Sequence, residues 1–193
     1  MLEYFHIEAP KVTQLKENWY NLHGAIHEIV PNLKIFGYGG STHAFFEQNG
    51  TVLGEAWSPY PYPNDDDFSK GLNQIVESLS EEYKDNPKLQ IIAMTHIGPY
   101  DSMSSVDTRT YKKKNKIVRA GSKSLGDALS TMKEYTLFNV HGHTHWSQKR
   151  DEVHEVPIIN PNWFFEGKYA EIYLEKDTDS ELWKLEKIEY LEL

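Results

Sequence analysis

The chain has 193 residues and a formal net charge of −9, with 39% hydrophobic and 25% charged residues. This length fits a single domain, residues 1–193, that can bury a proper core. The acidic balance disfavours general binding to nucleic acid or to anionic membrane, because both surfaces repel the chain. No apolar stretch approaches the about 20 residues of a membrane span, and the N-terminus does not resemble a signal peptide. We therefore expect a cytoplasmic protein. Since it contains no cysteine, any metal ion must be held by imidazole, carboxylate or amide ligands.

The first part of the chain predicts short strands and turns. Its first twenty residues are weakly periodic and indicate a short helix or an irregular lead-in. Pro31-Asn32 separates two strand patterns, and the glycine-rich segment 37–41 indicates a structural turn after the second. Asn49-Gly50 favours a hairpin turn. The expected strands are residues 25–30, 33–38, 44–47 and 51–53.

Helices are expected next, alternating with buried strands. Asp65-Asp66-Asp67 precede a helical pattern, and we interpret them as helix-start carboxylates rather than as a metal cluster. A second helix is predicted over residues 124–134. The predicted fold class is therefore α/β. The apolar face of the first helix comprises Phe68, Leu72, Ile75, Val76, Leu79 and Tyr83, and further strands are expected at 89–94, 135–140, 156–159, 169–174 and from 183 onward.

Two of the buried strand patterns end in histidines. Residues 89–94 are followed by Thr95-His96, and residues 135–140 by His-Gly-His-Thr-His. In an extended segment the side chains at i, i+2 and i+4 point to the same side, so His141, His143 and His145 are expected to converge. Neutral imidazoles offer lone pairs to a divalent transition metal, whereas charged ones repel one another. The sequence therefore predicts a metal site beyond the strand tips.

These motifs resemble those of the calcineurin-like metallophosphoesterases. Gly142-His143-Thr144-His145 is similar to their GHxH signature, and Thr95-His96 resembles the isolated histidine that precedes it. Ile159-Asn160-Pro161 resembles the Asn-Pro turn that follows the signature. The resemblance runs from about residue 33 to residue 174. It implies a layered β-sandwich flanked by helices, with the N-terminal part of the fold missing from this chain.

The resemblance also implies an activity and a set of ligands. A complete site of this family holds two divalent ions, such as Mn, Fe or Zn, which activate water to hydrolyse a phosphomonoester or phosphodiester. By carry-over, His96 and His143 ligate one ion and His145 the other. His141 precedes the signature and, with Asn160, is expected to support the ligands from behind.

The family's other ligand motifs are absent from this sequence. We find no Asp-x-His and no Gly-Asn-His; Asn21-Leu22-His23-Gly24 has the wrong spacing, and Gly126-Asp127 falls inside the second predicted helix. The site here is therefore expected to hold two ions, one or none. One hypothesis is that the chain is the C-terminal portion of a longer enzyme. The alternatives are an inactive scaffold of this fold that binds a protein partner or a single metal ion, and an unrelated small three-histidine zinc protein.

A long segment with little periodicity, residues 97–120, follows His96. Its basic side chains indicate either a solvated charge run or phosphate contacts near His96. For the second case, the candidate substrate-binding residues are Tyr100, Arg109 and Lys112. The basic residues are Arg109, Lys112, Lys113, Lys114, Lys116 and Arg119.

Overall fold

A computed structural model describes residues 13–16, 19–108 and 116–193. At its centre lies a six-stranded sheet with the order β13-β14-β12-β7-β4-β3. The four inner strands are parallel, and the edge strands β3 and β13 run antiparallel to their neighbours. The bounds are β3 Ala25–Val30, β4 Leu33–Tyr38, β7 Gln90–Thr95, β12 Thr136–Val140, β13 Arg150–Val153 and β14 Val156–Ile159.

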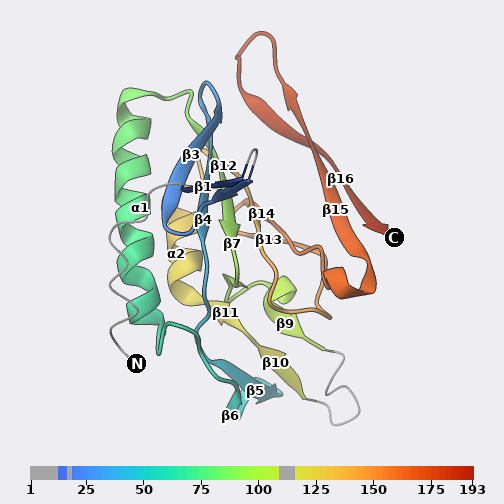
Figure 1. Cartoon of the computed structure of the whole chain (residues 1–193). Coiled ribbons are helices and arrows are strands. Elements are labelled where there is room, and N and C mark those ends of the chain that lie inside the picture. The colour runs from blue at the N-terminus through green and yellow to red at the C-terminus, as the bar shows by residue number, and fades with distance from the viewer. Residues whose placement is uncertain (1–12, 17–18, 109–115) are drawn as a thin grey trace.

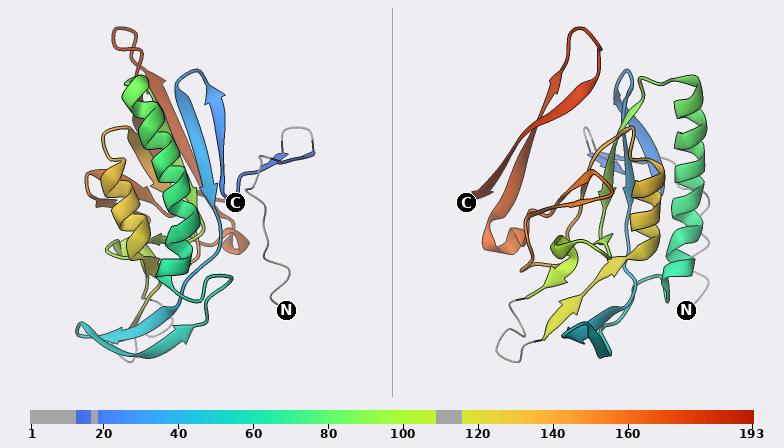
Figure 2. Two further views of the ribbon diagram at one scale, coloured as in Figure 1. Left: turned by 90° about the vertical axis from the view of Figure 1, so that its left-hand side faces the viewer. Right: turned by 180° about the vertical axis from the view of Figure 1, so that it is seen from behind.

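Two helices cover one face of this sheet (Figures 1 and 2). They are α1, Asp65–Asp85, and α2, Lys123–Thr131. Both predicted helices are therefore confirmed, although α2 ends earlier than expected. The predicted apolar face of α1 is confirmed in its five central members, which are buried against the sheet: Phe68, Leu72, Ile75, Val76 and Leu79.

The three aspartates lie in the first turn of α1, as predicted for helix-start carboxylates, but the cap is their neighbour and one of them also contacts α2. Asn64 is the N-cap, and its side chain accepts a hydrogen bond from the Asp67 amide at 2.8 Å. The Asp65 carboxylate reaches across to the start of α2. There it accepts hydrogen bonds from the Ser122 hydroxyl at 2.5 Å, and from the Ser124 amide and hydroxyl at 2.8 Å each. Asp65 thus joins the N-termini of the two helices.

A long hairpin lies over the opposite face of the sheet (Figures 1 and 2). It consists of β15, Lys168–Lys176, and β16, Trp183–Glu192. The arrangement confirms a mixed α/β architecture with apolar cores on both faces of the central sheet. On this face the buried sheet residues are Leu33, Ile92, Phe138 and Ile159, and the hairpin contributes Ile172, Leu174, Trp183, Leu185, Ile188 and Tyr190.

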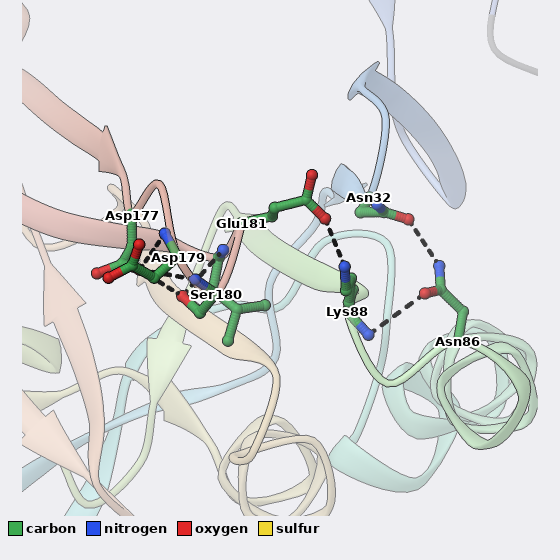
Figure 3. Close-up of polar contacts among 8 residues, drawn as sticks. Asn32, Asn86, Lys88, Asp177, Asp179, Ser180 and Glu181 are labelled. Atoms are coloured by element: carbon green, nitrogen blue, oxygen red, sulfur yellow. Dashed lines mark hydrogen bonds and ion pairs between the residues drawn. The ribbon is translucent and has the colours of Figure 1, made fainter.

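Polar contacts fix the turn of this hairpin and connect it to the body of the domain (Figure 3). The Asp177 carboxylate accepts hydrogen bonds from the Asp179 amide at 3.1 Å and from the Ser180 amide at 2.8 Å. Lys88, at the entry to β7, forms an ion pair with Glu181. The Gln90 side-chain amide also donates to the Trp183 carbonyl at 2.8 Å. The hairpin is therefore attached at its turn as well as through its apolar face.

A smaller sheet, β6-β5-β10-β9, lies beyond the carboxyl ends of the central strands (Figure 1). The predicted hairpin forms two of its strands, with Asn49 and Gly50 both at positive φ in the turn, as a type I′ turn requires. The expectation of an irregular segment 97–120 is wrong at both ends, because β10 pairs with β5 and β9, and β8 pairs with β11. The strands are β5 Ala44–Gln48, β6 Thr51–Trp57, β9 Val106–Asp107 and β10 Ile117–Arg119, and shorter elements are β8 Gly98–Pro99, the 3-10 helix η2 Met103–Ser105 and β11 Gly121–Ser122.

Near the N-terminus the expectation of a short helix or an irregular lead-in is wrong for the described residues. They form two short antiparallel strands, β1 (Thr13–Lys16) and β2 (Trp19–Asn21). A further 3-10 helix, η4 (Phe164–Glu166), precedes β15. Within the described ranges, neither helix has the length and apolar character that crossing a membrane requires.

Candidate metal centre

The predicted site residues lie at one edge of the central sheet, where the parallel strands end. His96 follows β7, the segment 141–145 follows β12, and Asn160 follows β14. The main chain links these ends: the His141 amide donates to the Ile159 carbonyl at 3.0 Å, and the Gly142 amide to the His96 carbonyl at 3.1 Å. The carboxyl ends of parallel strands are a common place for ligand sites in open α/β sheets.

His96 and His143 form the centre of this edge. His96 Nε2 and His143 Nδ1 lie 3.1 Å apart. Two imidazole nitrogens at about 2.0–2.1 Å from a single ion lie about 3.0–3.4 Å apart, so the pair has the spacing of two ligands of one ion. Burial, and then the neighbouring histidines, lower the pKa of His143 to about 4, and burial lowers the pKa of His96. Both rings are therefore neutral near pH 7, and the contact is a hydrogen bond in which one ring donates and the other accepts. When the donor ring takes its other tautomer, both facing lone pairs become available to a cation.

The backbone at His143 is in the left-handed region, with φ at 64°. Such a conformation is uncommon for a residue other than glycine. His143 Nε2 is also buried without a hydrogen-bond partner among the described residues, and the ring packs edge-on against Trp57 at 5.2 Å between centroids. A strained backbone and an unpaired buried nitrogen at one residue are typical of a functional position rather than of a packing residue.

The three histidines of segment 141–145 do not converge on one point, so the expectation from an extended segment is wrong. The turn at His143 re-aims each ring: His143 faces His96, while His145 stacks on Trp163 at 4.9 Å between centroids and 6° between planes. Over the described part of the chain, no three His, Asp or Glu side chains converge as a metal-holding group. The structure therefore brings together two of the three predicted ligands.

His141 is buried with both ring nitrogens engaged inside the protein. Its Nδ1 lies 3.0 Å from the Gly142 carbonyl, which can only accept, and its Nε2 lies 2.7 Å from the Ser104 hydroxyl. Burial lowers the pKa of His141 to about 4, so the ring is neutral, with its proton on Nδ1 at neutral pH. His141 is therefore not part of the His96–His143 pair. It supports the loop that carries His143 through its contacts with Gly142 and Ser104.

Asn160 connects the signature loop, residues 141–147 after β12, to the neighbouring segments. It is fully buried, and its amide nitrogen lies 2.9 Å from the Thr144 carbonyl, 3.1 Å from the Ser104 carbonyl and 2.8 Å from the Ser147 hydroxyl. Its side-chain oxygen accepts from the Asn162 amide at 2.8 Å. Asn160 therefore holds in place the backbone between His143 and His145 and connects it to the segment after β7.

Ser104 brings the segment after His96 into the same network, a role that no sequence pattern indicates. Its carbonyl accepts from the Thr144 hydroxyl at 2.6 Å. Its hydroxyl lies 2.6 Å from that of Ser102, which donates to the Asp151 carboxylate at 3.0 Å. These hydroxyls are fully buried. They fix the segment after β7 against the segment after β12, and hence His96 against His143.

Gly98 is needed for this packing. A Cβ at Gly98 would overlap the Ser105 hydroxyl and would lie 2.5 Å from His141 Nε2. We expect Gly98→Ala to lower the free energy of unfolding by about 1–2 kcal/mol through overpacking, measured by urea denaturation. Gly126→Ala, on α2 with only Pro99 at 4.0 Å, is the control and should be neutral or stabilising. Equal effects of the two changes would contradict the packing role.

The candidate substrate-binding residues fall in different places. Tyr100 packs against Arg119 and Lys123, with each cation 5.2 Å from its ring centroid, and Arg119 pairs with Glu47 at 2.8 Å. Tyr100 therefore belongs to the junction of β10 and α2. Arg109 and Lys112 lie outside the described residues, so their predicted contact with phosphate stays a prediction.

A cavity of about 400 Å³ opens beside His96, and His23 is one of its lining residues. His23 was not expected in the site, because segment 21–24 does not have the spacing of the family motif. The His23 ring stacks on Tyr38 at 5.5 Å, and its Nδ1 accepts from the Gly39 amide at 2.9 Å. The glycine-rich exit of β4, which we expected to be only a turn, thus forms part of a cavity wall. The available signal was the joint presence of a histidine and a glycine-rich strand exit.

No family profile matches the chain, and no curated protein is significantly similar to it. One solved structure is similar over 89% of this chain and 53% of its own length, at 15% identity and a TM-score of 0.50. The protein TT1561 of Thermus thermophilus matches over 89% of this chain and 58% of its own, at 16% identity and a TM-score of 0.48. The chain thus spans a little over half the length of these structures. At such identities, the first likeness shows a shared mixed α/β fold and nothing about activity.

Proposed function

We propose that this chain supplies the histidine side of a calcineurin-like metallophosphoesterase site, in which a divalent metal ion assists hydrolysis of a phosphate ester. The observation that carries the proposal is the close pair of neutral imidazoles, with His96 Nε2 and His143 Nδ1 3.1 Å apart at the carboxyl edge of a parallel sheet. A packing role does not explain that pair, because the strain at His143 and its unpaired Nε2 both oppose folding. The sheet, its outer helices and the hairpin over its other face support the layered sandwich of that family.

The residues present fit one ion on two imidazoles. His96 and His143 would hold it, and His145 would serve a second ion across the signature loop. Bound Mn, Fe or Zn would supply an activated water and charge stabilisation for a phosphoryl group. His141, Asn160 and Ser104 hold the ligands in place through the contacts described above. Among the described residues no carboxylate joins the two imidazoles in a three-ligand group, so the proposal concerns the histidine side of the site.

That same observation favours a second candidate function. Two neutral imidazoles alone do little to offset the charge of two divalent ions. A protein that binds one metal ion and does not turn over phosphate esters, acting as a scaffold for a protein partner, is therefore the alternative.

Hydrolysis of 4-nitrophenyl phosphate and bis(4-nitrophenyl) phosphate with Mn²⁺, Fe²⁺ or Zn²⁺ tests the proposal. We expect metal-dependent turnover that is lost in His143→Asn, which retains a residue that tolerates positive φ. His154→Asn is the matched control, because His154 is an exposed histidine that also has positive φ, 52°. Metal binding without turnover would favour the scaffold, and turnover unaffected by His143→Asn would contradict both candidates.

A further inference from the structure

The cavity beside His96 has a wall composition that indicates what it can bind. It lies between β2 with the two residues that follow it and the carboxyl ends of β4 and β7. Tyr20, Leu22 and Met94 give it apolar walls, and Tyr20 and Met94 are each 43% exposed, so they face both the cavity and solvent. The remaining described residues that line it are Asn21, His23, Gly37, Tyr38, Gly39, Thr95 and His96.

None of these described lining residues is Asp, Glu, Lys or Arg. In a chain in which 25% of the residues are charged, this concave surface has no permanently charged side chain among its described lining residues, and it therefore offers a charged group no ion-pair partner. Its size, about 400 Å³, lies in the range of small-molecule sites. An uncharged group of nucleoside size suits this cavity better than a charged headgroup or an acidic peptide.

His23 supplies the directional contact. Its Nδ1 accepts the Gly39 amide proton at 2.9 Å, so the neutral ring carries its proton on Nε2, which is then a donor. Burial lowers the pKa of His23 and keeps the ring neutral. Gly39 permits this close approach, since a Cβ there would lie 3.1 Å from His23 Nδ1. The cavity thus combines apolar walls with a hydrogen-bond donor at His23, whose backbone amide is in turn held by the Asn21 side-chain oxygen at 3.0 Å.

We propose that this cavity binds the uncharged aromatic group of a phosphate ester, a nucleobase or comparable ring, with an acceptor atom facing His23. The proposal rests on the proposed function for its orientation: the phosphate would lie at the His96–His143 pair, and the ring would extend past His96 into the cavity. Thr95 Oγ1 already donates to the Ile97 carbonyl at 2.8 Å and accepts from Asn139 at 2.9 Å. His23 is therefore the polar group best placed to recognise the ring.

Titration of the metal-free chain with adenosine tests this inference, followed by NMR of the histidine rings and methionine methyl groups. We expect saturable chemical-shift changes at His23 and Met94. Ribose, which lacks the aromatic base, should show no comparable binding. His23→Asn keeps an acceptor for the Gly39 amide at the position of Nδ1, but the shorter side chain has no donor at the position of Nε2, and it should weaken adenosine binding about fivefold to tenfold. Met94→Glu places a carboxylate in the cavity wall and should weaken it at least as much.

Leu53→Glu is the control for the added charge, because Leu53 is similarly exposed, at 47%, and lies on β6 outside the cavity. It should leave adenosine binding unchanged. Absence of saturable binding, equal binding of ribose, or indifference to both Met94→Glu and His23→Asn would each overturn the inference. The outcome is separable from that of the proposed function: adenosine binding in a chain that binds no metal upholds the cavity site, and metal binding without adenosine binding rejects it.

Discussion

Replacing Asn160 with leucine is expected to lower the free energy of unfolding by about 2–4 kcal/mol, although the two side chains are similar in size. The reason is that Asn160 is fully buried and forms hydrogen bonds both within the signature loop and to the segment after β7. Leucine removes its contacts to the Thr144 and Ser104 carbonyls, at 2.9 and 3.1 Å, and leaves the Asn162 amide without its acceptor. Each buried polar group left unpaired costs about 1–3 kcal/mol.

Urea denaturation followed by circular dichroism measures this effect. Asn73→Leu is the control, because Asn73 lies on the exposed side of α1, and it should change stability by less than about 0.5 kcal/mol. We also expect the Asn160→Leu chain to bind metal more weakly, since the His143 backbone loses its support. A variant that is as stable as the Asn73→Leu control would show that Asn160 does not hold the loop.

Asp65→Ala is expected to cost about 2–3 kcal/mol, from the loss of three charge-assisted contacts at the start of α2. The carboxylate accepts from Ser122 and Ser124, and it also faces the positive end of the helix dipole. Because α1 and α2 lie on the same face of the sheet, the loss should loosen the packing of one helix against the other.

The neighbouring Asp66 provides a control in the same turn. It is exposed, and the described contacts give its carboxylate no role in joining the helices. Asp66→Ala should therefore cost about 0.5 kcal/mol or less, the usual size of an exposed helix-dipole interaction. Thermal or urea unfolding of both variants measures the difference, and equal destabilisation would show that the effect of Asp65 is only that of a charge at a helix start.

The elements that the sequence predicted well are those whose pattern is local. Helical spacing in 68–83 predicted the buried face of α1, and Asn49-Gly50 predicted the hairpin turn. The strand β13 was missed because Arg150–Val153 is polar, and it becomes a strand only by pairing with β14. The ends of segment 97–120 were missed for the same reason, since β10 depends on its partner β5, which lies far away in the sequence. Long-range pairing of this kind leaves little trace in local periodicity.

The candidate site divides in the same way. The proximity of two histidines at strand ends could be predicted from the sequence, because the carboxyl ends of parallel strands lie at the same edge of the sheet. The structure places His96 beside His143. The orientation of each ring could not be predicted, because the positive φ at His143 changes the direction of the chain within segment 141–145. The role of Ser104 could not be predicted, because it acts through a contact with a segment distant in sequence. His23 and the glycine-rich strand exit were both visible, but the contact between them was not.

Zinc titration of the chain with ¹⁵N-labelled histidines, followed by long-range proton–nitrogen correlation, tests the central claim most directly. We predict that the first bound ion gives coordination-type shifts at His96 Nε2 and His143 Nδ1, the two nitrogens that lie 3.1 Å apart. The exposed His154 should not change. Shifts at His143 Nε2 instead of Nδ1, or saturation of zinc binding with both His96 and His143 unchanged, would contradict this prediction.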